Sequence, residues 1–324
     1  MSGTRSGDIA VGVVLVNWNG WQHTVEACKS LGDFGGPGVK TIIVDNASTD
    51  SSVERIRAAL PAVEVVANPI NMGFAGGCNV GIGRALEMGC NYIFLLNNDA
   101  LVTPNTISEL IAASERLNDS AILGSVVRYV GSRGYQFFGS RSTPIFGQPA
   151  WFTCPNDEKL LEAGLIETDF VLGAALFIPA KLIETIGLFD ERFYLTYEDV
   201  DLCYRARNIG ALCGIVTSST VYHHASVSMG PEDAPLQTYF LTRNELLFTE
   251  KHGKRRQRFH MYYLRLGRLI WRTTKALATG SWSDPSLKAM VLGYRDYVLR
   301  RFGDCPGAVR RYAGAYHRRS QQKG

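Results

Sequence analysis

The first 116 residues repeat a pattern in which a short apolar segment is followed by a polar turn and then by a helical stretch. The apolar segments span residues 11–16, 40–44, 63–66 and 91–96, and the helical stretches span 22–31, 53–60, 79–88 and 104–116. Short apolar runs rich in Val and Ile are typical of strands buried on both faces of a parallel sheet. Their alternation with helices predicts right-handed βαβ units and an α/β fold.

Beyond residue 120 the pattern changes. Residues 122–130, 169–179 and 215–222 have the composition of strands, and residues 133–155 form a loop-rich stretch between the first two. From residue 236 the chain is mostly helical, with breaks near 280–285 and 303–307. We therefore expect a mixed central sheet in a domain of residues 1–245, followed by a helical region of residues 246–324. Within the domain of residues 1–245, residues 9–116 would form the nucleotide-binding half and residues 117–245 the acceptor-binding half.

Polar residues follow the expected strands at the point where each one ends. Open α/β sheets bind ligands at the carboxyl ends of their strands, so this edge predicts a nucleotide or sugar site. The glycines Gly73, Gly76 and Gly77 lack both the GxGxxG spacing and the lysine of a P-loop. We expect them to permit close approach of the backbone to a ligand, with Asn71 and Asn79 as polar contacts.

A metal site is indicated by Asn97, Asn98 and Asp99 at one strand end. Carboxylate and amide oxygens suit Mg²⁺ or Mn²⁺ on a diphosphate better than Zn²⁺. His223 ends another strand, and an imidazole beside such oxygens favours Mn²⁺ or a tolerant site. Asn and Asp are also common in turns for backbone reasons, and the adjacent His224 leaves the choice of histidine open.

Residues 187–205 place four carboxylates among aromatic side chains: Asp190, Glu198, Asp199 and Asp201. Apolar surroundings raise the proton affinity of a carboxylate, as a general base near neutral pH requires. The same residues also fit a helix capped at Thr196 with acids in its first turn, where they would complement the helix dipole. The residues alone leave both interpretations open.

Seven motifs resemble, in their order along the chain, the family-2 inverting glycosyltransferases of GT-A fold, and within them the bacterial rhamnosyltransferase branch. They are VNWNG (16–20), VDNASTD (44–50), NMGFAGGCNVGI (71–82), LLNNDA (95–100), GAALFIP (173–179), GLFDERFYLTYEDVDLCYRA (187–206) and HHASVS (223–228). The resemblance covers residues from about 9 to 245. It implies a Rossmann-like nucleotide-binding half, a nucleoside-diphosphate sugar donor and direct displacement with inversion.

The resemblance also implies roles for individual residues. Asp199 matches the catalytic base, Asp99 the second acid of a metal-binding DxD motif, and His223 a further metal ligand. Asn97 replaces the first acid of that motif, so fewer charges would hold a Mg²⁺ or Mn²⁺ ion. Asp45 matches the residue that reads the pyrimidine. The expected donor contacts are Asn17, Asp45, Asn71, Gly73, Phe74, Asn79, Asn97 and Asn98. The expected acceptor contacts are Gly173, Ala174 and Glu198, with the loop at 133–155.

Composition excludes several classes of protein. With 46% apolar and 20% charged residues the chain is typical of a globular protein. It has no apolar run long enough for a membrane-spanning helix, and its first residues do not form a secretory signal. The seven cysteines form no CxxC pair, which predicts reduced thiols in a cytoplasmic protein.

Charge is divided unevenly along the chain. Residues 251–324 carry 18 Lys or Arg and three Asp, whereas the first 250 residues carry 16 basic and 27 acidic side chains. One predicted helical face carries Arg258, Arg265, Arg268, Arg272 and Lys275, and the neighbouring face carries Phe259, Tyr263, Leu266, Ile270 and Trp271. Such a helix favours an anionic membrane surface, although a helix packed on the domain with a solvated basic side also fits. No recognition motif for nucleic acid accompanies the charge.

Together these features predict transfer of L-rhamnose from dTDP-β-L-rhamnose to a lipid-linked glycan at the cytoplasmic face of the membrane, in cell-surface polysaccharide synthesis. A UDP-sugar such as UDP-galactofuranose or a UDP-hexose is the alternative donor. A sugar-phosphate nucleotidyltransferase would need a Gly-rich signature with Arg and Lys near the N-terminus, and no such signature precedes Lys29. Asp99, Asp199 and His223 argue against a non-catalytic glycan-binding adaptor.

Overall fold

The computed structural model describes residues 9–34, 38–132, 134–142, 149–151, 158–224 and 234–313. The chain divides into two compact units. The sheet unit comprises Met1–Arg141, Pro149–Asp190 and Asp199–His224, and the helical unit comprises Ser142–Gln148, Glu191–Glu198 and Ala225–Gly324. The boundary that we expected after residue 245 lies inside helix α7 (Ala234–His252), so the cut falls earlier in the chain.

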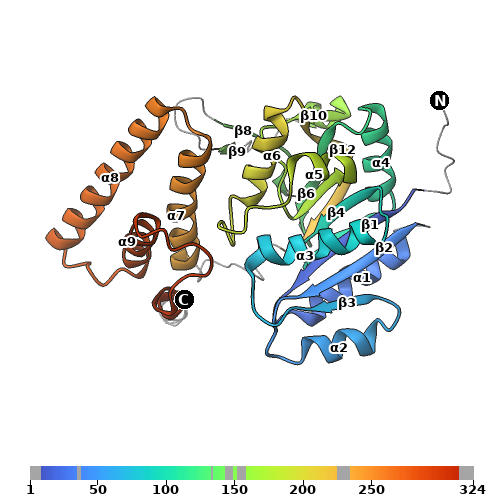
Figure 1. The fold of residues 1–324 in the computed structure, drawn as a ribbon, viewed down its shortest axis with the longest axis horizontal. Coiled ribbons are helices and arrows are strands. Elements are labelled where there is room, and N and C mark those ends of the chain that lie inside the picture. Colours follow the sequence, from blue (N-terminus) through green and yellow to red (C-terminus); the bar gives the residue numbers. More distant parts are fainter. Residues whose placement is uncertain are drawn as a thin grey trace. The chain divides into compact units, whose positions relative to one another are not determined.

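Among the described residues, ten strands form one mixed sheet whose main order is β10-β12-β6-β11-β4-β1-β2-β3 (Figure 1). The parallel part consists of β1 (Val11–Asn17), β2 (Val39–Asp45), β3 (Glu64–Ala67) and β4 (Tyr92–Leu96). These four strands agree with the apolar segments of the sequence. Asn17 pairs in register with Asp45, so two of the expected site residues lie side by side at the carboxyl ends of β1 and β2.

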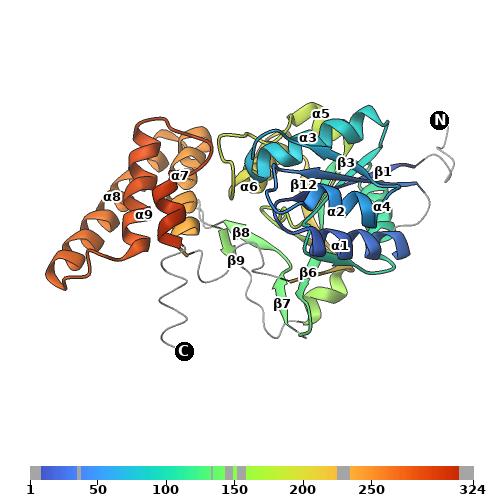
Figure 2. The same ribbon diagram turned by 90° about the horizontal axis from the view of Figure 1, so that it is seen from below.

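The helices of the parallel part cover both faces of the sheet. They are α1 (Trp21–Phe34), α2 (Ser52–Ala59) and α3 (Gly73–Glu87). Figure 2 shows α3 on one side of the sheet and α1 and α2 on the other. Burial on both faces explains why β1 and β4 are continuous apolar runs.

The second part of the sheet is mixed. Strand β11 (Ala175–Pro179) runs antiparallel to β4 and to β6 (Ala121–Tyr129), and β12 (Leu212–His223) runs parallel to β6. The short strands β5 (Ala100–Val102), β7 (Tyr135–Phe137) and β10 (Leu165–Glu167) join its edges, and β8 (Ser140–Ser142) pairs with β9 (Pro149–Trp151). The remaining helical elements are α4 (Thr106–Arg116), the 3₁₀ helix at Glu158–Ala163, α5 (Ala180–Ile186) and α6 (Glu198–Asn208).

The sequence did not predict every strand correctly. The strand expected over 169–179 begins only at Ala175, because Gly173 and Ala174 form a turn. Strands β5 and β10 have three residues each, too few for a hydrophobic period to be recognised. Pairing of β5 with β12 places His223 opposite Ala100, beside Asp99.

Glycines of helix α3 have a packing role that the sequence did not predict. A Cβ atom added at Gly81 would lie 2.2 Å from Val14 Cγ1, and one at Gly77 would lie 2.8 Å from Val16 Cγ1. At Gly76 the added atom would meet Met72 at 2.6 Å. The small residues therefore let α3 lie close against β1.

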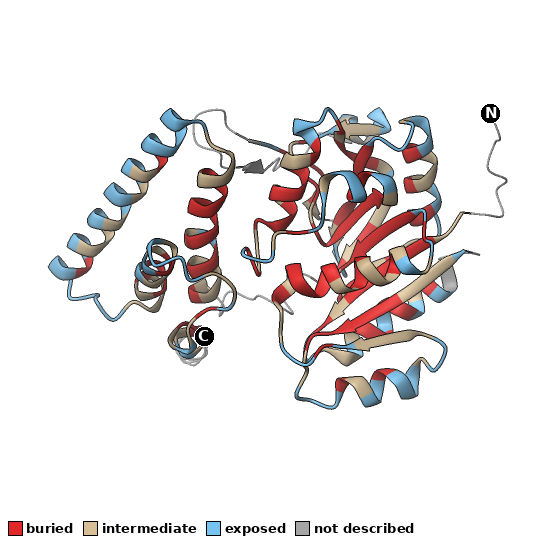
Figure 3. Cartoon of the chain, in the orientation of Figure 1, coloured by how far each residue is buried: buried red, intermediate tan, exposed pale blue. Residues whose placement is uncertain are grey.

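The helical unit is built from α7, α8 (Arg255–Ala278) and α9 (Pro285–Val298). Its core contains Tyr194, Tyr239, Phe240, Ala289, Cys305 and Val309. Figure 3 shows that α7 is largely buried, whereas most of α8 is exposed. The expected break near 280–285 is confirmed, since Asp284 caps α9 by accepting a hydrogen bond from the Ser286 backbone N–H.

The loop Glu191–Glu198 of the helical unit has an unusual backbone. Tyr194, Thr196 and Tyr197 have φ angles of 64°, 67° and 75°, a region that side-chain-bearing residues seldom adopt. Each such residue costs about 1–3 kcal/mol, so the surrounding structure must hold the loop in place. The helix expected after Thr196 is present, but the buried Thr196 hydroxyl has no hydrogen-bond partner among the residues that the structure describes, so it does not cap the helix.

Two expectations about the whole chain concern membranes and thiols. Within the described ranges no helix is both long and apolar enough to cross a lipid bilayer. Six cysteines, Cys28, Cys78, Cys90, Cys203, Cys213 and Cys305, are buried and form no disulfide among the described residues, in agreement with their unpatterned spacing. Burial raises the pKa of the Cys28 thiol to about 12.

Candidate active site

Asn17 and Asp45 form a buried network at the ends of β1 and β2. The Asn17 side-chain amide donates to Asp45 Oδ2 at 2.7 Å and to the Ser48 hydroxyl at 3.1 Å. Asp45 also accepts from the Ser48 backbone N–H at 2.9 Å and from its hydroxyl at 2.6 Å. The hydroxyl of Thr24, on α1, donates to Asn17 Oδ1 at 2.7 Å. These contacts fix the orientation of both predicted donor-site residues.

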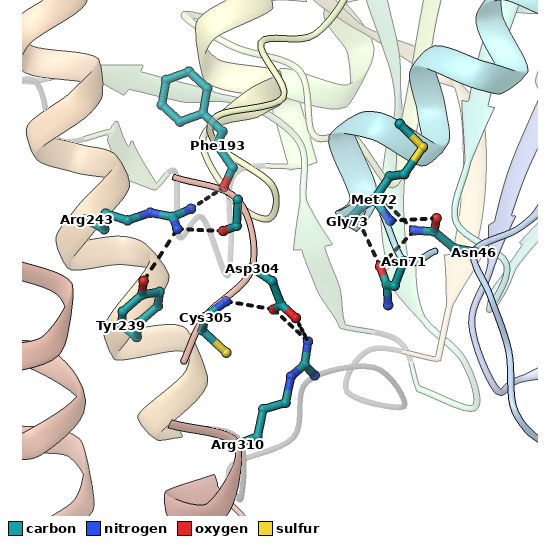
Figure 4. Close-up of polar contacts among 11 residues, drawn as sticks. Asn46, Asn71, Met72, Gly73, Phe193, Tyr239, Arg243, Asp304, Cys305 and Arg310 are labelled. Atoms are coloured by element: carbon teal, nitrogen blue, oxygen red, sulfur yellow. Dashed lines mark hydrogen bonds and ion pairs between the residues drawn. The ribbon is translucent and has the colours of Figure 1, made fainter. Parts of the chain in front are cut away.

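Asn46 connects this edge to the start of α3 (Figure 4). Its carbonyl oxygen accepts from the Met72 backbone N–H at 3.0 Å and from Asn68 at 3.1 Å. Its amide nitrogen donates to the Gly73 carbonyl at 2.8 Å and to Asn71 Oδ1 at 3.1 Å. Asn71 in turn accepts from the Gly73 backbone N–H at 2.8 Å. Asn46 therefore organises the loop that carries Asn71 and Gly73.

Asn79 has a different task from the donor contact that we predicted. Its amide nitrogen donates to the Phe189 carbonyl at 3.0 Å, and its carbonyl oxygen accepts from the Phe189 backbone N–H at 2.9 Å. Both polar ends of the side chain thus bind one backbone residue, which joins α3 to the segment before the acidic motif. This placement speaks against a contact between Asn79 and the donor.

Asp99 and His223 lie together, as predicted from their positions at strand ends. Their Oδ1 and Nε2 atoms are 2.9 Å apart, and Nε2 also lies 3.1 Å from the Asn97 amide nitrogen. His223 Nδ1 lies 2.8 Å from Gln136 Oε1. Because the amide oxygen of Gln136 can only accept a hydrogen bond, His223 Nδ1 must carry a proton and donate it. In the neutral ring the lone pair is then on Nε2, the nitrogen that faces Asp99.

These residues fit a divalent cation. Asp99 is buried, and apart from the ring of His223 its Oδ1 has no hydrogen-bond partner in the described part of the chain. Burial works to raise the pKa of Asp99, but the hydrogen bond and charge of His223 outweigh it and lower that pKa. A carboxylate oxygen and an imidazole nitrogen that face each other at 2.9 Å require a cation or a proton between them. Their chemistry matches Mn²⁺ or Mg²⁺ with water as additional ligands.

Asp199, the predicted base, lies at the start of α6 and is 8% exposed. Its Oδ2 accepts from the Gly173 backbone N–H at 2.9 Å, and its Oδ1 accepts from the Val200 N–H at 2.8 Å. Burial raises the pKa of Asp199 above the ordinary aspartate value, and the backbone N–H groups of Gly173, Val200 and Asp199 itself oppose this shift. The carboxylate is therefore held in one orientation with an increased proton affinity.

The turn at Gly173 and Ala174 links Asp199 to the Asp99 loop. The backbone N–H of Gly173 binds Asp199, and the carbonyl of Ala174 accepts from the Asn97 backbone N–H at 3.0 Å. A Cβ atom on Gly173 would lie 3.2 Å from the ring of Phe74 and 3.6 Å from Asp199 Oδ2. Two adjacent residues thus connect the predicted base, the predicted metal loop and Phe74, all within the sheet unit.

The contacts of the remaining predicted site residues do not indicate a particular role. Asn98 is half-buried and donates to the Thr24 hydroxyl at 3.1 Å. Glu198, the first residue of α6, is buried. Residues 133, 143–148 and 152–155 of the predicted acceptor loop, and residues 225–228 of the HHASVS motif, fall outside the described residues.

Two site residues, Asn46 and Gln136, were missed at the sequence level. Asn46 stands inside the VDNASTD motif, and its position directly after Asp45 was a usable signal. Gln136 lies on β7, in a stretch that the sequence presents only as loop, so nothing marked it.

Comparison with known proteins identifies the class of enzyme. The family model described as glycosyl transferase family 2 matches residues 12–184. The chain therefore belongs to glycosyl transferase family 2, it is a glycosyltransferase, and its mixed α/β sheet is the GT-A fold.

Similar proteins of known name include two that are named for rhamnosyl transfer. The chain is 26% identical over 241 residues to the N-acetylglucosaminyl-diphospho-decaprenol L-rhamnosyltransferase of Mycobacterium tuberculosis, covering 68% of this chain and 78% of that protein. It is 21% identical over 218 residues to the dTDP-rhamnosyl transferase RfbF of Shigella flexneri, covering 65% and 71%. It is also 26% identical over 240 residues to the low-salt glycan biosynthesis hexosyltransferase Agl10 of Haloferax volcanii, covering 72% and 74%.

Solved structures share the fold. The mannosyltransferase PcManGT from Pyrobaculum calidifontis, in complex with GDP-Man and Mn²⁺, superposes with a TM-score of 0.57 at 14% identity, covering 91% of this chain and 90% of that one. GalNAc-T7 with UDP, GalNAc and Mn²⁺ also gives a TM-score of 0.57, at 16% identity, and the match covers 80% of this chain and 57% of that one.

Proposed function

We propose that this glycosyltransferase moves L-rhamnose from dTDP-β-L-rhamnose to a hydroxyl of a lipid-linked glycan, with inversion at the anomeric carbon. Two of the similar proteins are named for rhamnosyl transfer, and one of these names a diphospho-decaprenol acceptor. Such a reaction belongs to the synthesis of a cell-surface polysaccharide.

The observation that carries the mechanism is the turn at Gly173 and Ala174. It anchors Asp199 on one side and the loop of Asn97 and Asp99 on the other. A single displacement needs a base on the acceptor side of the anomeric carbon and charge stabilisation on the diphosphate side. Two neighbouring residues that bind both groups fix this relation within one rigid part of the sheet unit.

Asp199 would remove the proton of the acceptor hydroxyl as that oxygen attacks. Its increased proton affinity suits this role, because a base that is too weak takes little charge from the nucleophile. Its Oδ2 and Oδ1 atoms each accept one backbone N–H, so both oxygens keep a lone pair for the incoming proton. Proton transfer to a positioned base contributes about 10²–10⁴ in rate.

Asp99 and His223 would hold the divalent cation, and Gln136 would keep the His223 ring in its ligating tautomer. When bound, Mn²⁺ or Mg²⁺ offsets the negative charge of the departing diphosphate. On the nucleotide side, Asp45 Oδ1 accepts only the Ser48 N–H among the described contacts. That oxygen keeps a lone pair with which it could accept a ring N–H of the pyrimidine.

Thermal stabilisation by nucleotide sugars tests the donor. A ligand that binds only the folded chain at about 100 times its Kd adds roughly 2.7 kcal/mol of stability. We expect dTDP-rhamnose with Mn²⁺ or Mg²⁺ to raise the melting temperature more than UDP-galactofuranose or a UDP-hexose does. If a UDP-sugar stabilises the chain more, the rhamnose assignment is wrong and the transferase assignment remains. If no sugar nucleotide binds with either metal, the proposed donor chemistry fails.

We further propose that α8 lies on an anionic membrane surface. Phe259, Tyr263, Leu266, Ile270 and Leu277 recur at spacings of four, three, four and seven residues, and their exposed fractions range from 54% to 75%. These spacings align them along one side of the helix. The exposed cations on the same helix are Arg255, Arg256, Arg258, Arg268 and Lys275. An exposed apolar stripe flanked by positive charge is suited to the headgroup region of an anionic bilayer.

The basic face differs from the one that the sequence predicted. Arg265 is largely buried and pairs with Glu245 of α7, and Arg272 pairs with Asp284 at 3.5 Å. These two side chains therefore point toward the rest of the helical unit and are not available to lipid headgroups.

Sedimentation with lipid vesicles tests this surface. We expect binding to vesicles that contain phosphatidylglycerol, and at least a tenfold loss of binding in Leu266→Glu and Ile270→Glu. Ile209→Glu replaces an exposed isoleucine of the sheet unit and is the matched control. Equal binding by the α8 variants and the wild type would refute the membrane proposal.

A further inference from the structure

Three side chains with metal-ligating atoms meet at α1, and none of them takes part in the proposed transfer reaction. His23 and Glu26 lie one turn apart on α1, and His224 directly follows β12. Each offers one ligand atom, and these three atoms lie within 4.8 Å of one another. His224 Nε2 is 3.7 Å from Glu26 Oε2, and the rings of His23 and His224 have centroids 5.4 Å apart.

This cluster is separate from the pair of Asp99 and His223. Successive residues of an extended chain point to opposite sides, so the imidazoles of His223, which ends β12, and of His224, which follows it, diverge. The His223 ring contacts Asp99, Asn97 and Gln136. The His224 ring instead faces His23 and Glu26.

The cluster also contains unsatisfied polar atoms. His23 Nδ1 and His224 Nε2 are both buried and, among the described residues, have no hydrogen-bond partner. Buried polar atoms in folded proteins nearly always have a partner, so two such nitrogens in one cluster require an explanation. A metal ion coordinated by the cluster would supply one.

We propose that His23, Glu26 and His224 bind a divalent transition-metal ion at a second site. Two imidazoles and one carboxylate form the ligand set that proteins use for Zn²⁺ with an open fourth position, and Co²⁺ accepts the same set. Mg²⁺ is disfavoured because it prefers oxygen ligands. Glu26 is exposed, so water can occupy the open position. This site does not depend on the proposed rhamnosyl transfer.

Co²⁺ titration of the chelator-treated full chain tests the site. Every protein in this experiment carries the substitution Asp99→Asn, which weakens metal binding at the site of Asp99 and His223. We expect one equivalent of Co²⁺ to bind with a visible absorption band and to be displaced by Zn²⁺. Adding His224→Ala or Glu26→Gln should weaken binding by at least about 100-fold, since even an outer-shell change costs 10–100-fold. His260→Ala, on exposed α8, should change nothing.

Melting temperatures measured without metal show whether each variant folds. Because Glu26 is exposed, Glu26→Gln should fold and can decide the test even if His224→Ala does not fold. Absence of Co²⁺ binding in the Asp99→Asn chain would overturn the proposal. Undiminished binding in Glu26→Gln, or an equal loss in His260→Ala, would also overturn it.

A second inference rests on a different observation, the contacts between α7 and the loop Glu191–Glu198. Arg243 is 0% exposed, and its Nη2 donates to the carbonyls of Arg192 at 3.2 Å and Phe193 at 3.0 Å. Its Nη1 donates to the Gly303 carbonyl at 2.6 Å and lies 3.5 Å from the Tyr239 hydroxyl (Figure 4). The guanidinium thus connects this loop with the segment that follows α9.

Asn244 completes the contact. Its amide nitrogen lies 2.8 Å from the carbonyl oxygens of Phe193, Leu195 and Thr196. These carbonyls belong to the segment in which Tyr194, Thr196 and Tyr197 have positive φ angles. A backbone in that conformation persists only where surrounding contacts enforce it.

We infer that Arg243 and Asn244 are positioning residues for the base. The loop that they hold runs through Glu198 directly into Asp199, so a shift of its backbone moves that carboxylate. This inference rests on the proposed role of Asp199. A displacement of about 1 Å at a reacting group can cost about 10²-fold in rate.

Arg243→Lys and Asn244→Ala test the inference in the full chain. Lysine keeps the charge and loses the planar fork of donors. We expect faster hydrogen exchange in residues 191–198, kcat lowered by about 10–100-fold, and unchanged KM for the donor. Arg300→Ala removes an exposed arginine of the same unit, paired with Glu250, and should leave all three quantities unchanged.

Unchanged exchange in both variants would overturn the inference, as would faster exchange with unchanged kcat. A fall in kcat that merely follows the folded fraction would also overturn it. If the wild-type chain transfers no sugar at all, the proposed function fails, while the exchange measurement still decides whether Arg243 and Asn244 hold the loop.

Discussion

The sheet unit and the helical unit both bury polar side chains, but with different chemistry. At the strand ends of the sheet unit, neutral amides and hydroxyls satisfy one another, as Asn17, Asn46 and Asn71 show. The buried charges there are carboxylates such as Asp45, Asp99 and Asp199, whereas the helical unit buries an arginine, Arg243, together with the carboxylates Glu245 and Asp296. Parallel strands bring successive turns to one edge, so short polar side chains find partners there. Helices have no such edge, and a charge can be buried only where another helix or loop supplies its partner.

The same contrast explains where reactivity lies. Asp199 accepts hydrogen bonds from backbone N–H groups and has no arginine or lysine among its described hydrogen-bond partners. Asp296 accepts from the Tyr239 hydroxyl at 2.9 Å and pairs with Arg295 at 2.7 Å. A buried carboxylate without a cation keeps its affinity for a proton, whereas a paired one serves only stability.

The largest expected effect is the loss of the proposed base. Asp199→Asn should lower kcat by about 10²–10⁴-fold, because the side chain can no longer accept the proton. Donor affinity, measured by thermal shift with metal present, should be unchanged. A variant that still transfers sugar at more than a tenth of the wild-type rate would exclude Asp199 as the base.

Breaking a buried pair of the helical unit should have the next largest effect. In Arg265→Met, Glu245 stays buried and loses its arginine, so the free energy of unfolding should fall by about 3–5 kcal/mol. Arg300→Met breaks the exposed pair with Glu250 and should lower the free energy of unfolding far less, because water screens that pair. Urea denaturation compares the two, and equal losses would contradict the idea that burial makes the difference.

Removing an amide of the sheet unit should cost less than removing a charge of the helical unit. Asn46→Ala leaves the Met72 N–H and the Gly73 carbonyl without their partner, which should lower the free energy of unfolding by about 2–3 kcal/mol. Donor affinity should fall as well, because the loop with Asn71 loses its support. Ser108→Ala changes an exposed hydroxyl of α4 and serves as the control in the same denaturation series.

The smallest expected effect is a dependence of stability on pH. Burial raises the pKa of Asp199 in the folded chain, so the folded state holds its proton to a higher pH than the unfolded state does. The contribution of this group to stability therefore falls as pH rises from about 4 through its folded pKa, by at most about 1.4 kcal/mol per pH unit. The stability difference between wild type and Asp199→Asn, measured over this pH range, isolates the slope. A difference that does not vary with pH would contradict the raised pKa.

The transfer reaction should show the same shift. The base must be ionised to act, so the acid limb of kcat/KM should lie above the pH range in which exposed aspartates titrate. A limb that lies at or below pH 4 would exclude a raised pKa at the base.

The sequence by itself determined the parallel half of the sheet. Buried strands such as β1 and β4 must be apolar along their whole length, and the turns after them must be polar, so composition and spacing located Asn17, Asp45 and Asp99. The family motifs singled out Asp199 among four carboxylates and His223 from the adjacent His224, and the neighbourhoods of both residues in the structure suit the expected roles.

Only the tertiary structure decided which partners these residues have. That Asn79 binds Phe189 and that Gln136 orients His223 depends on contacts between segments separated by 110 and 87 residues. The glycines of α3 and the arginines of α8 have no local pattern that tells a packing role from a binding role. Gly81 has a packing role because Val14 of β1 lies against it, and Arg265 is buried because it pairs with Glu245 of α7. A periodic pattern along the chain carries no information about which residues of other elements lie against it.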